Sequence, residues 1–479
     1  MTKTKKNSLV LAICVIILEL IGGMQTYLTQ LILPIMAADL DAQDMYGVIT
    51  GVGSLSTMVG LPIGATFLRR CRLPRILLTA TAALIVGAII SATAPTIWVF
   101  LIGRAIRGFA GACLAMTSIG AVAVGLTGRA RQLTLAFNSA SWIIASIVGP
   151  SYAAWVTHLL SWRWAMLCYL PFLLAARIVI AENLDADQHS DDSPMPLKAT
   201  GLIAIGITLI IVPVPSPWKY VLMIAGFLIL GWVAIISMPP HTFTTGGIRL
   251  HALAGLFFLT GAYYSANELV TLSYHDLFGG DAKDLGYIIL GGGLGWAITG
   301  VLAGLKPTKN PRHYLIRIGV GVGLIITAST LITVALATRM AGLPPFQAMM
   351  VLWISAGIGM GVVYLDVLST LFEDPIVPDG IPIEAIAGSS VIVENLASAM
   401  FVPLLTSLVA VAFPQHGTST PITPPRWPYA LSWGLVAVLA VIALSYLIRS
   451  GHSEKAAWLA KPAEADQSDR AAQAQPSVR

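Results

Sequence analysis

Stretches of about 20 apolar residues recur from one end of the chain to the other, and a helix of that length crosses the hydrocarbon core of a bilayer. The chain has 479 residues, of which 56% are hydrophobic and only 11% are charged, whereas soluble domains carry about 25% charged residues. The runs are continuously apolar and do not alternate, which excludes a transmembrane β-barrel. The sequence therefore predicts a polytopic, all-α membrane protein.

Proline, glycine and charged residues divide the chain into fourteen predicted spans. The first run is too long for a signal peptide and lacks a small-residue cleavage site after it, so we expect it to remain as a span. The predicted spans are residues 8–36, 45–68, 76–95, 97–126, 132–158, 164–182, 199–215, 219–238, 250–273, 285–304, 314–338, 345–371, 383–413 and 428–448.

Basic residues are concentrated in alternate short loops. Clusters follow the second span, at residues 69–75, and the tenth span, at residues 306–317, whereas the loops between hold only scattered Lys and Arg. Such an excess marks cytoplasmic loops, so both termini are expected inside the cell. The net charge of +5 reflects this bias and is no sign of nucleic-acid binding.

Four acidic residues lie inside stretches that are otherwise apolar. A charge at the middle of a membrane helix costs about 2.5–3.5 kcal/mol, so such residues usually face a bundle interior or a watery cavity. A carboxylate removed from water is protonated more readily, which makes each acid a candidate for proton coupling. The alternative is that an acid only neutralises a buried Arg or caps a helix contact. The four are Glu19, Glu268, Glu394 and Asp366.

The chain lacks the motifs of the common enzyme and metal sites. Its four cysteines show no Cys-x-x-Cys or Cys/His spacing, so neither a metal site nor a disulfide framework is expected. No phosphate-binding loop, nucleophile elbow or His-Glu-x-x-His motif occurs. His275–Asp276 has no evident third partner for catalysis. We therefore expect a protein that is not an enzyme and has no cofactor.

Four short motifs lie in order along the first six spans. Leu33–Pro34 ends the first span, and Arg104, Arg107 and Gly108 form Leu-x-x-Arg-x-x-Arg-Gly-x-x-Gly in the fourth. Gly149–Pro150 forms the centre of Ala-x-x-x-Gly-Pro-x-x-Ala-Ala in the fifth, and Trp162–Arg163–Trp164 with Pro171 opens the sixth. Together these resemble the fourteen-helix drug–proton antiporter branch of the major facilitator superfamily, over nearly the whole chain.

The resemblance implies a major facilitator fold of two six-helix halves, with two extra helices between them. Residues 1–182 would form the N-terminal half and residues 246–450 the C-terminal half. Residues 183–245 would hold a cytosolic linker and the two extra helices, and the polar residues 451–479 would form a disordered cytosolic tail.

The chain departs from the family pattern at charged positions. Gln25 and Gln30 stand where the first helix of the family has Asp and Asn, and Asn395 occupies the place of an Arg in the thirteenth. Physical reasoning offers Glu19 as a substitute acid, because Glu19, Thr26 and Gln30 fall within about 40° on a helical wheel. This polar stripe is expected to face a cavity.

A second polar patch is predicted on the ninth span. Tyr263 with Asn267, and Tyr264 with Glu268, are i, i+4 pairs on adjoining faces. Aromatic rings around an acid suit a cationic or amphipathic substrate. Alternatively, these tyrosines lie at the membrane interface. Further candidates for the cavity wall are Asn138, Trp142 and Tyr152 on the fifth span.

Helix movement could be coupled to protonation through the arginines of the fourth span. A buried Arg needs a carboxylate or carbonyl partner, and an acid that alternates between paired and protonated states would link proton binding to movement. Gly149–Pro150 would add a kink and allow close helix contact.

The sequence thus predicts a monomeric secondary transporter in the plasma membrane, the inner membrane of a bacterium. It would export hydrophobic or amphipathic small molecules by alternating access, driven by a proton gradient. An exporter of lipid or glycolipid to the cell envelope is one alternative, since mycobacterial triacylglycerol exporters belong to the same branch. A membrane scaffold or sensor that transports nothing is another.

Overall fold

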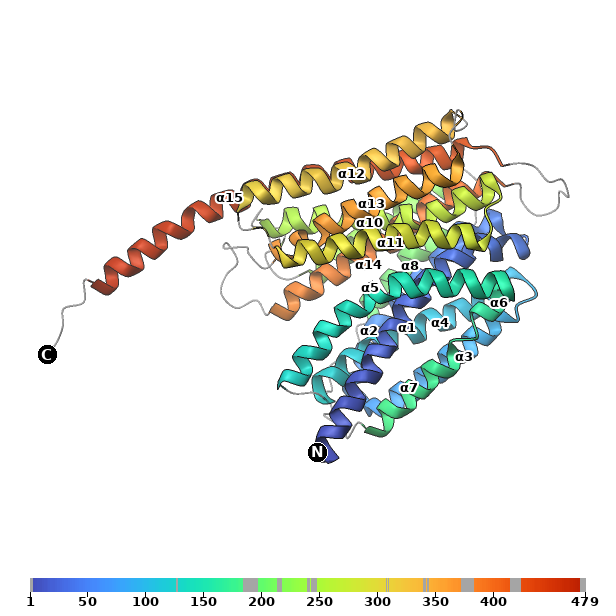
Figure 1. The fold of residues 1–479 in the computed structure, drawn as a ribbon, viewed down its shortest axis with the longest axis horizontal. Helices are drawn as coiled ribbons and strands as arrows, with labels where there is room; N and C mark the ends of the chain where they lie inside the picture. Colours follow the sequence, from blue (N-terminus) through green and yellow to red (C-terminus); the bar gives the residue numbers. More distant parts are fainter. Residues whose placement is uncertain are drawn as a thin grey trace.

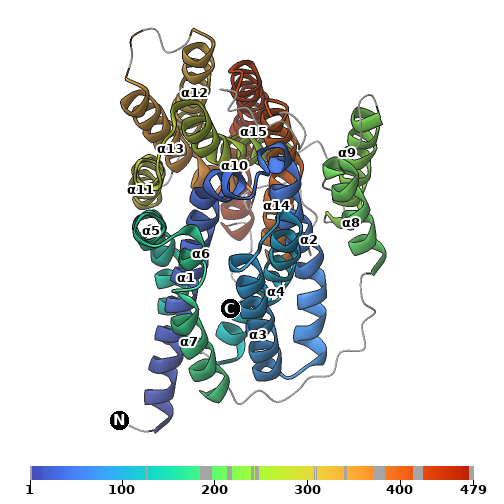
Figure 2. The ribbon, with the colours of Figure 1, turned by 90° about the vertical axis from the view of Figure 1, so that its right-hand side faces the viewer.

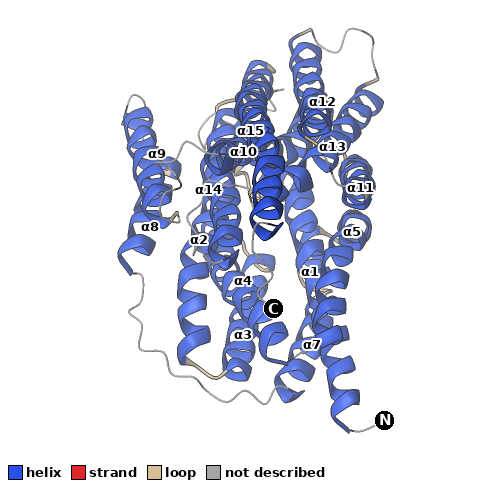
Figure 3. Cartoon of the chain, turned by 90° about the vertical axis from the view of Figure 1, so that its left-hand side faces the viewer, coloured by secondary structure: helices blue, strands red, loops and turns tan. Residues whose placement is uncertain are grey.

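The computed structural model describes residues 3–125, 128–183, 197–212, 218–238, 242, 248–306, 308, 310–338, 342, 344–371, 383–413 and 424–473. These residues are mostly helical and contain no strand (Figures 1 and 3). The N-terminal helices are α1 (Lys3–Asp39), α2 (Tyr46–Arg70), α3 (Leu73–Ala92), α4 (Ile97–Gly125), α5 (Gly128–Leu159), α6 (Trp162–Ala165) and α7 (Leu170–Asn183), with a short 3-10 helix, η1 (Gln43–Met45), before α2. The others are α8 (Leu197–Ile211), α9 (Trp218–Ser237), α10 (Ile248–Phe278), α11 (Ala282–Leu305), α12 (Pro311–Ala337), α13 (Pro345–Thr370), α14 (Ile383–Ala410) and α15 (Trp427–Gln473).

Each predicted span corresponds to a helical segment, and the all-α fold is confirmed. Ten helices in the described part of the chain are long and apolar enough to cross a membrane, and α6 with α7 counts as one of these segments. The break between α6 and α7 was not predicted; α7 begins at Leu170–Pro171, and Pro favours the first turn of a helix because its missing N–H is not needed there.

The C-terminal tail was expected to be disordered, and here the prediction was wrong. The structure continues α15 as a helix to Gln473, so that the helix extends beyond the bundle (Figure 1). The segment is rich in Ala, which has the highest intrinsic helix propensity. A polar composition therefore did not prevent helix formation. The predicted cytosolic linker, residues 185–196, lies outside the described residues.

Apart from α8 and α9, the described helices form two sets of six segments with the same neighbour relations, if α6 and α7 are counted as one segment. In the first set α1 packs on α5 and α7, α4 packs on α2 and α3, and α3 packs on α7. In the second set α10 packs on α14 and α15, α13 packs on α11 and α12, and α12 packs on α15. We call the set α1–α7 the first bundle and the set α10–α15 the second bundle. The two bundles thus repeat one arrangement of helices.

The two bundles meet along α1–α10 and along two outer pairs, α5–α11 and α2–α14. Helices α8 and α9 pack on each other and on α14, and α8 also packs on α2 (Figure 2). Ile207 and Ile211 of α8 are buried there with Met58 of α2 and Met400 of α14. The two extra helices therefore cover one of the outer pairs, α2–α14.

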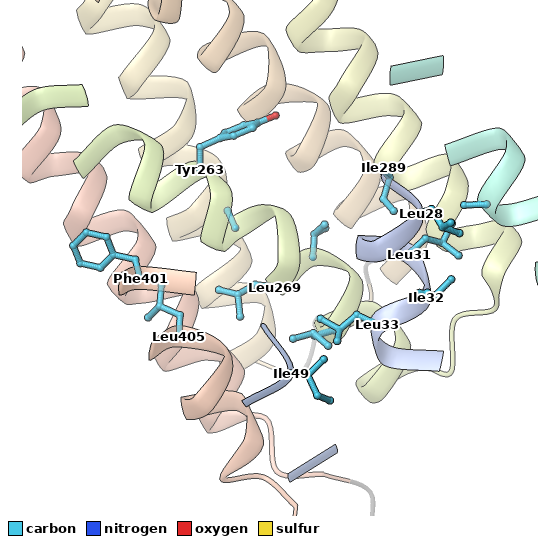
Figure 4. Packing of buried hydrophobic residues seen from close by; sticks show 14 of the residues in the cluster. Leu28, Leu31, Ile32, Leu33, Ile49, Tyr263, Leu269, Ile289, Phe401 and Leu405 are labelled. Atoms are coloured by element: carbon cyan, nitrogen blue, oxygen red, sulfur yellow. The ribbon is translucent and has the colours of Figure 1, made fainter. Parts of the chain in front are cut away.

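Apolar side chains fill the space where the bundles meet. Leu33 of α1, Ile49 of α2 and Leu269 of α10 belong to one buried cluster, and each is at most 2% exposed (Figure 4). The cluster continues between helices of both bundles, for example to Ile289 of α11. Polar residues that remain inside such packing are the candidates for function.

Candidate functional site

Arg104 of α4 and Glu268 of α10 belong to different bundles and are both part of the buried interior. The two charges are close enough to interact electrostatically. The Nε atom of Arg104 and the Oε2 atom of Glu268 are both buried without a hydrogen-bond partner. A buried polar atom without a partner is costly, so this pair is poised to gain from a proton, water or ligand.

Arg107 lies one turn after Arg104 and adds a second positive charge, which repels that of Arg104. Its Nε atom is likewise buried without a partner. Gly108 lets α4 approach α2 closely, because a Cβ there would lie 2.8 Å from the Cβ of Ser56. The Arg-rich motif thus combines buried positive charge with a tight helix contact.

Glu394 of α14 accepts hydrogen bonds from two tyrosines of its own bundle. The Tyr364 hydroxyl on α13 donates to Oε1 at 2.9 Å, and the Tyr264 hydroxyl on α10 donates to Oε2 at 3.2 Å. The sequence left open whether Glu394 faces a cavity or binds an Arg; the bonds that the structure gives it come from tyrosines.

Asp366 pairs with an arginine of its own bundle, and Glu19 lies within electrostatic range of one. Glu19 of α1 interacts electrostatically with Arg177 of α7, and Asp366 of α13 forms an ion pair with Arg317 of α12 at 3.1 Å. Asp366 therefore occupies the arrangement that the sequence offered as the structural alternative, neutralisation of an Arg.

The polar stripe of α1 divides between two environments. Gln30 is buried, and its Nε2 donates to the backbone carbonyl of Asn267 in the second bundle. Thr26 is exposed and its hydroxyl donates to its own helix, at Gly22. Gln25 is half-buried. Asn395, the other amide at a position that is charged in the family pattern, lies in α14, and its side chain donates to the carbonyl of Val391 one turn earlier.

The predicted aromatic patch on α10 does not surround a single acid. Tyr263 is buried, stacks on Trp353 of α13 and meets Trp296 of α11 edge to face, with ring centroids 5.3 Å apart in both cases. Tyr264 instead reaches Glu394, while Glu268 faces Arg104. Neighbouring residues of one helix point to different partners, because 100° of rotation separates them.

The Gly149–Pro150 motif lies where α5 packs against α1. A Cβ at Gly149 would lie 2.9 Å from the ring of Tyr27 and 3.2 Å from the Cα of Met24, so this glycine permits a close helix contact. The Tyr152 hydroxyl donates to the carbonyl of Ala165 at 2.8 Å, which ties α5 to α6. The side chains of Asn138 and Trp142 lie outside the described residues.

Sequence reasoning missed a polar hub around Asp276. Its carboxylate is 3% exposed and accepts hydrogen bonds from Tyr46 at 3.0 Å and Tyr429 at 2.7 Å, and it contacts His275 Nδ1 at 2.9 Å. The adjacent His and Asp were noticed, but the tyrosines come from α2 and α15, far away in the sequence. Arg177 and Arg317, the partners of Glu19 and Asp366, were missed for the same reason.

Comparison with known proteins assigns a family. The profile of the Major Facilitator Superfamily matches residues 15–374. An Acurin A biosynthesis cluster MFS-type transporter of Aspergillus aculeatus is 28% identical over 267 residues, 51% of this chain and 47% of that protein. A probable multidrug-efflux transporter of Mycobacterium tuberculosis is 24% identical over 383 residues, 73% of this chain and 78% of that protein. A triacylglyceride transporter of Mycobacteroides abscessus is 24% identical over 205 residues, 41% of this chain and 40% of that protein.

The match thus spans less than half of the fungal transporter and of the triacylglyceride transporter. Among solved structures, a mutant of the peptide transporter POT in complex with alafosfalin has the same fold, with a TM-score of 0.68. It is 14% identical, and the alignment covers 95% of this chain and 100% of that one.

Proposed function

Because the chain belongs to the Major Facilitator Superfamily and is a multi-pass transporter of the cell membrane, we propose that it exports hydrophobic or amphipathic small molecules in exchange for protons, by alternating access. The similarity to a probable multidrug-efflux transporter over 73% of the chain supports the substrate class.

The observation that carries the proposal is that Arg104 and Glu268, which belong to different bundles, each bury a side-chain polar atom without a hydrogen-bond partner. Of the four embedded acids, Glu268 is the one whose arginine lies in the other bundle, whereas Glu19 and Asp366 face arginines of their own bundle. Protonation of Glu268 would remove its attraction to Arg104 and so weaken a contact between the bundles. Proton binding and relative movement of the bundles would thereby be linked.

The test is flux in proteoliposomes under an imposed pH gradient. The purified protein is reconstituted and a lipophilic cationic dye is followed with and without the gradient. We expect gradient-driven movement of the dye by the natural protein. Glu268→Gln should abolish the dependence on the gradient, because the amide cannot exchange a proton.

A matched variant separates coupling from general damage. Glu182→Gln makes the same chemical change at an exposed position near the end of α7 and should leave the flux unchanged. If Glu268→Gln retained full gradient-driven flux, the coupling role would be refuted. Glu19, Glu394 and Asp366 would then be tested in the same way, since their roles in proton coupling remain predictions.

Lipid export is the second candidate, favoured by the similarity to a triacylglyceride transporter. A fluorescent lipid is therefore tested in parallel with the dye. Movement of the lipid without movement of the dye would favour export of envelope lipids. Movement of the dye alone would favour the multidrug type.

A further inference from the structure

The hydrogen bonds between the two bundles are gathered toward one end of the molecule. We call this the distal end: it is the end at which α1, α10 and α14 finish and α2 begins. Between described residues of the two bundles, side chains make hydrogen bonds at three places: Gln30 to the carbonyl of Asn267, Tyr46 to Asp276, and Thr50 to Thr406. In Figure 1 the bundles fan apart toward the opposite end, where the chain begins.

Asp276 is the strongest of these connections. The Tyr46 hydroxyl approaches both carboxylate oxygens, at 3.0 and 3.1 Å, and Tyr46 is itself fully buried. Tyr46 also meets Phe413, which follows α14, edge to face. Since a hydrogen bond to a buried carboxylate is roughly twice as strong as one between neutral groups, this contact holds the first bundle to the second.

Two other bonds to Asp276 stay within the second bundle. The Tyr429 hydroxyl on α15 donates to Oδ2 at 2.7 Å, and His275 Nδ1 contacts Oδ1 at 2.9 Å. These bonds keep the carboxylate partnered when Tyr46 withdraws, which lowers the penalty of separation. The hub is thus built so that one of its bonds can break while the others persist.

Thr50 adds a weaker bond one turn further along α2. Its hydroxyl lies 2.9 Å from that of Thr406 on α14, and both side chains are buried. Each hydroxyl also contacts a carbonyl of its own helix, so neither is left without a partner when the bundles part.

We propose that Tyr46, Asp276 and the Thr50–Thr406 contact form a latch that keeps the distal end closed and opens once in each transport cycle. Tyr46 and Asp276 act as positioning residues and need not touch the substrate. The distribution of basic loops assigns the distal end to the outside of the cell. The inference relies on the proposed alternating access, but its test needs neither substrate nor a proton gradient.

Thiol labelling in lipid nanodiscs tests the latch, because a charged maleimide reaches both faces of the protein there. The reporter is Leu33→Cys in a chain whose four natural cysteines are replaced by serine. Leu33 is 2% exposed at the junction of the bundles, so its labelling reports opening of the distal end.

Tyr46→Phe removes the bond between the bundles, and Tyr429→Phe removes a bond to the same carboxylate inside one bundle. We expect labelling to be about tenfold faster with Tyr46→Phe. Tyr429→Phe should stay within about twofold of the parent. No acceleration by Tyr46→Phe, or equal acceleration by both variants, would overturn the proposal.

A second matched pair lies on the same helix and decides the question if Tyr46→Phe fails to fold. Thr50→Val removes the contact with Thr406. Thr66→Val removes a hydroxyl whose hydrogen bond, among the described residues, stays within α2, at Pro62. Labelling should rise about threefold with Thr50→Val, as expected for a bond between neutral groups, and should not change with Thr66→Val. Equal rates in the two variants would also refute the latch.

Discussion

The ion pair between Asp366 and Arg317 allows a prediction in which the order of the effects is as informative as their size. Arg317 Nη1 donates to both oxygens of Asp366, at 3.1 and 3.3 Å, and Thr308 donates to one of them at 3.3 Å. The Asp366 side chain is only 4% exposed, whereas that of Arg317 is 25% exposed and also bonds to the carbonyl of Lys306. The acid depends on its partner more than the arginine does.

Arg317→Met leaves a buried carboxylate without its countercharge, which costs about 3–5 kcal/mol. Asp366→Asn keeps an acceptor for Thr308 and Arg317, and the arginine can still reach water, so the cost is about 1–2 kcal/mol. The double variant should be more stable than Arg317→Met alone, because it removes the uncompensated charge. Arg312→Met, at an exposed position of the same helix, should have no effect.

Thermal unfolding in detergent, followed by loss of the monodisperse peak in size-exclusion chromatography, measures these differences. If the second bundle unfolds as one unit, each kcal/mol corresponds to about 2–4 °C. Arg317→Met should lower Tm by roughly 6–20 °C and Asp366→Asn by roughly 2–8 °C. The reasoning would be refuted if Asp366→Asn were the more damaging change, or if the double variant lost as much as the two single losses added together.

Two further predictions concern the second bundle. A Cβ at Gly357 would lie 2.1 Å from the carbonyl oxygen of Gly292, so Gly357→Ala should push α13 away from α11 and cost about 1–3 kcal/mol of stability. Gly319→Ala, whose Cβ would have no atom within 4 Å, should not lower Tm. Equal losses of Tm in the two variants would contradict the packing argument. Tyr364→Phe should leave Glu394 with a single tyrosine donor and lower the free energy of unfolding by about 1.5–3 kcal/mol, measured as a lower Tm in the same assay. An unchanged Tm would mean that water replaces the hydroxyl at no cost.

The membrane helices themselves could be predicted from the sequence. A backbone inside a bilayer must satisfy its own hydrogen bonds, so an apolar run of sufficient length can adopt only a helix there. This local rule placed all fourteen segments. It does not apply to the polar residues after 450, and there the expectation of disorder gave way to a continuous helix, α15.

The partners of the embedded acids could not be predicted in the same way. Glu19 lies within electrostatic range of Arg177, and Glu268 within that of Arg104, each across a long separation in the sequence. Helical periodicity gives the side of a helix on which a residue lies, but not which other helix covers that side. Neighbouring residues such as Tyr263 and Tyr264 therefore looked like one patch and belong to two.

From the sequence alone follow the class of protein, the approximate positions of its helices, and the list of polar residues that a membrane would not tolerate without a reason. Each of these depends on the free energy of a single segment in the bilayer, which its composition determines. Only the tertiary structure decided which acid faces an arginine of the other bundle and that Asp276 joins α2, α10 and α15. Such pairings depend on the order and rotation of packed helices, and these are set by the side-chain contacts of the whole fold together.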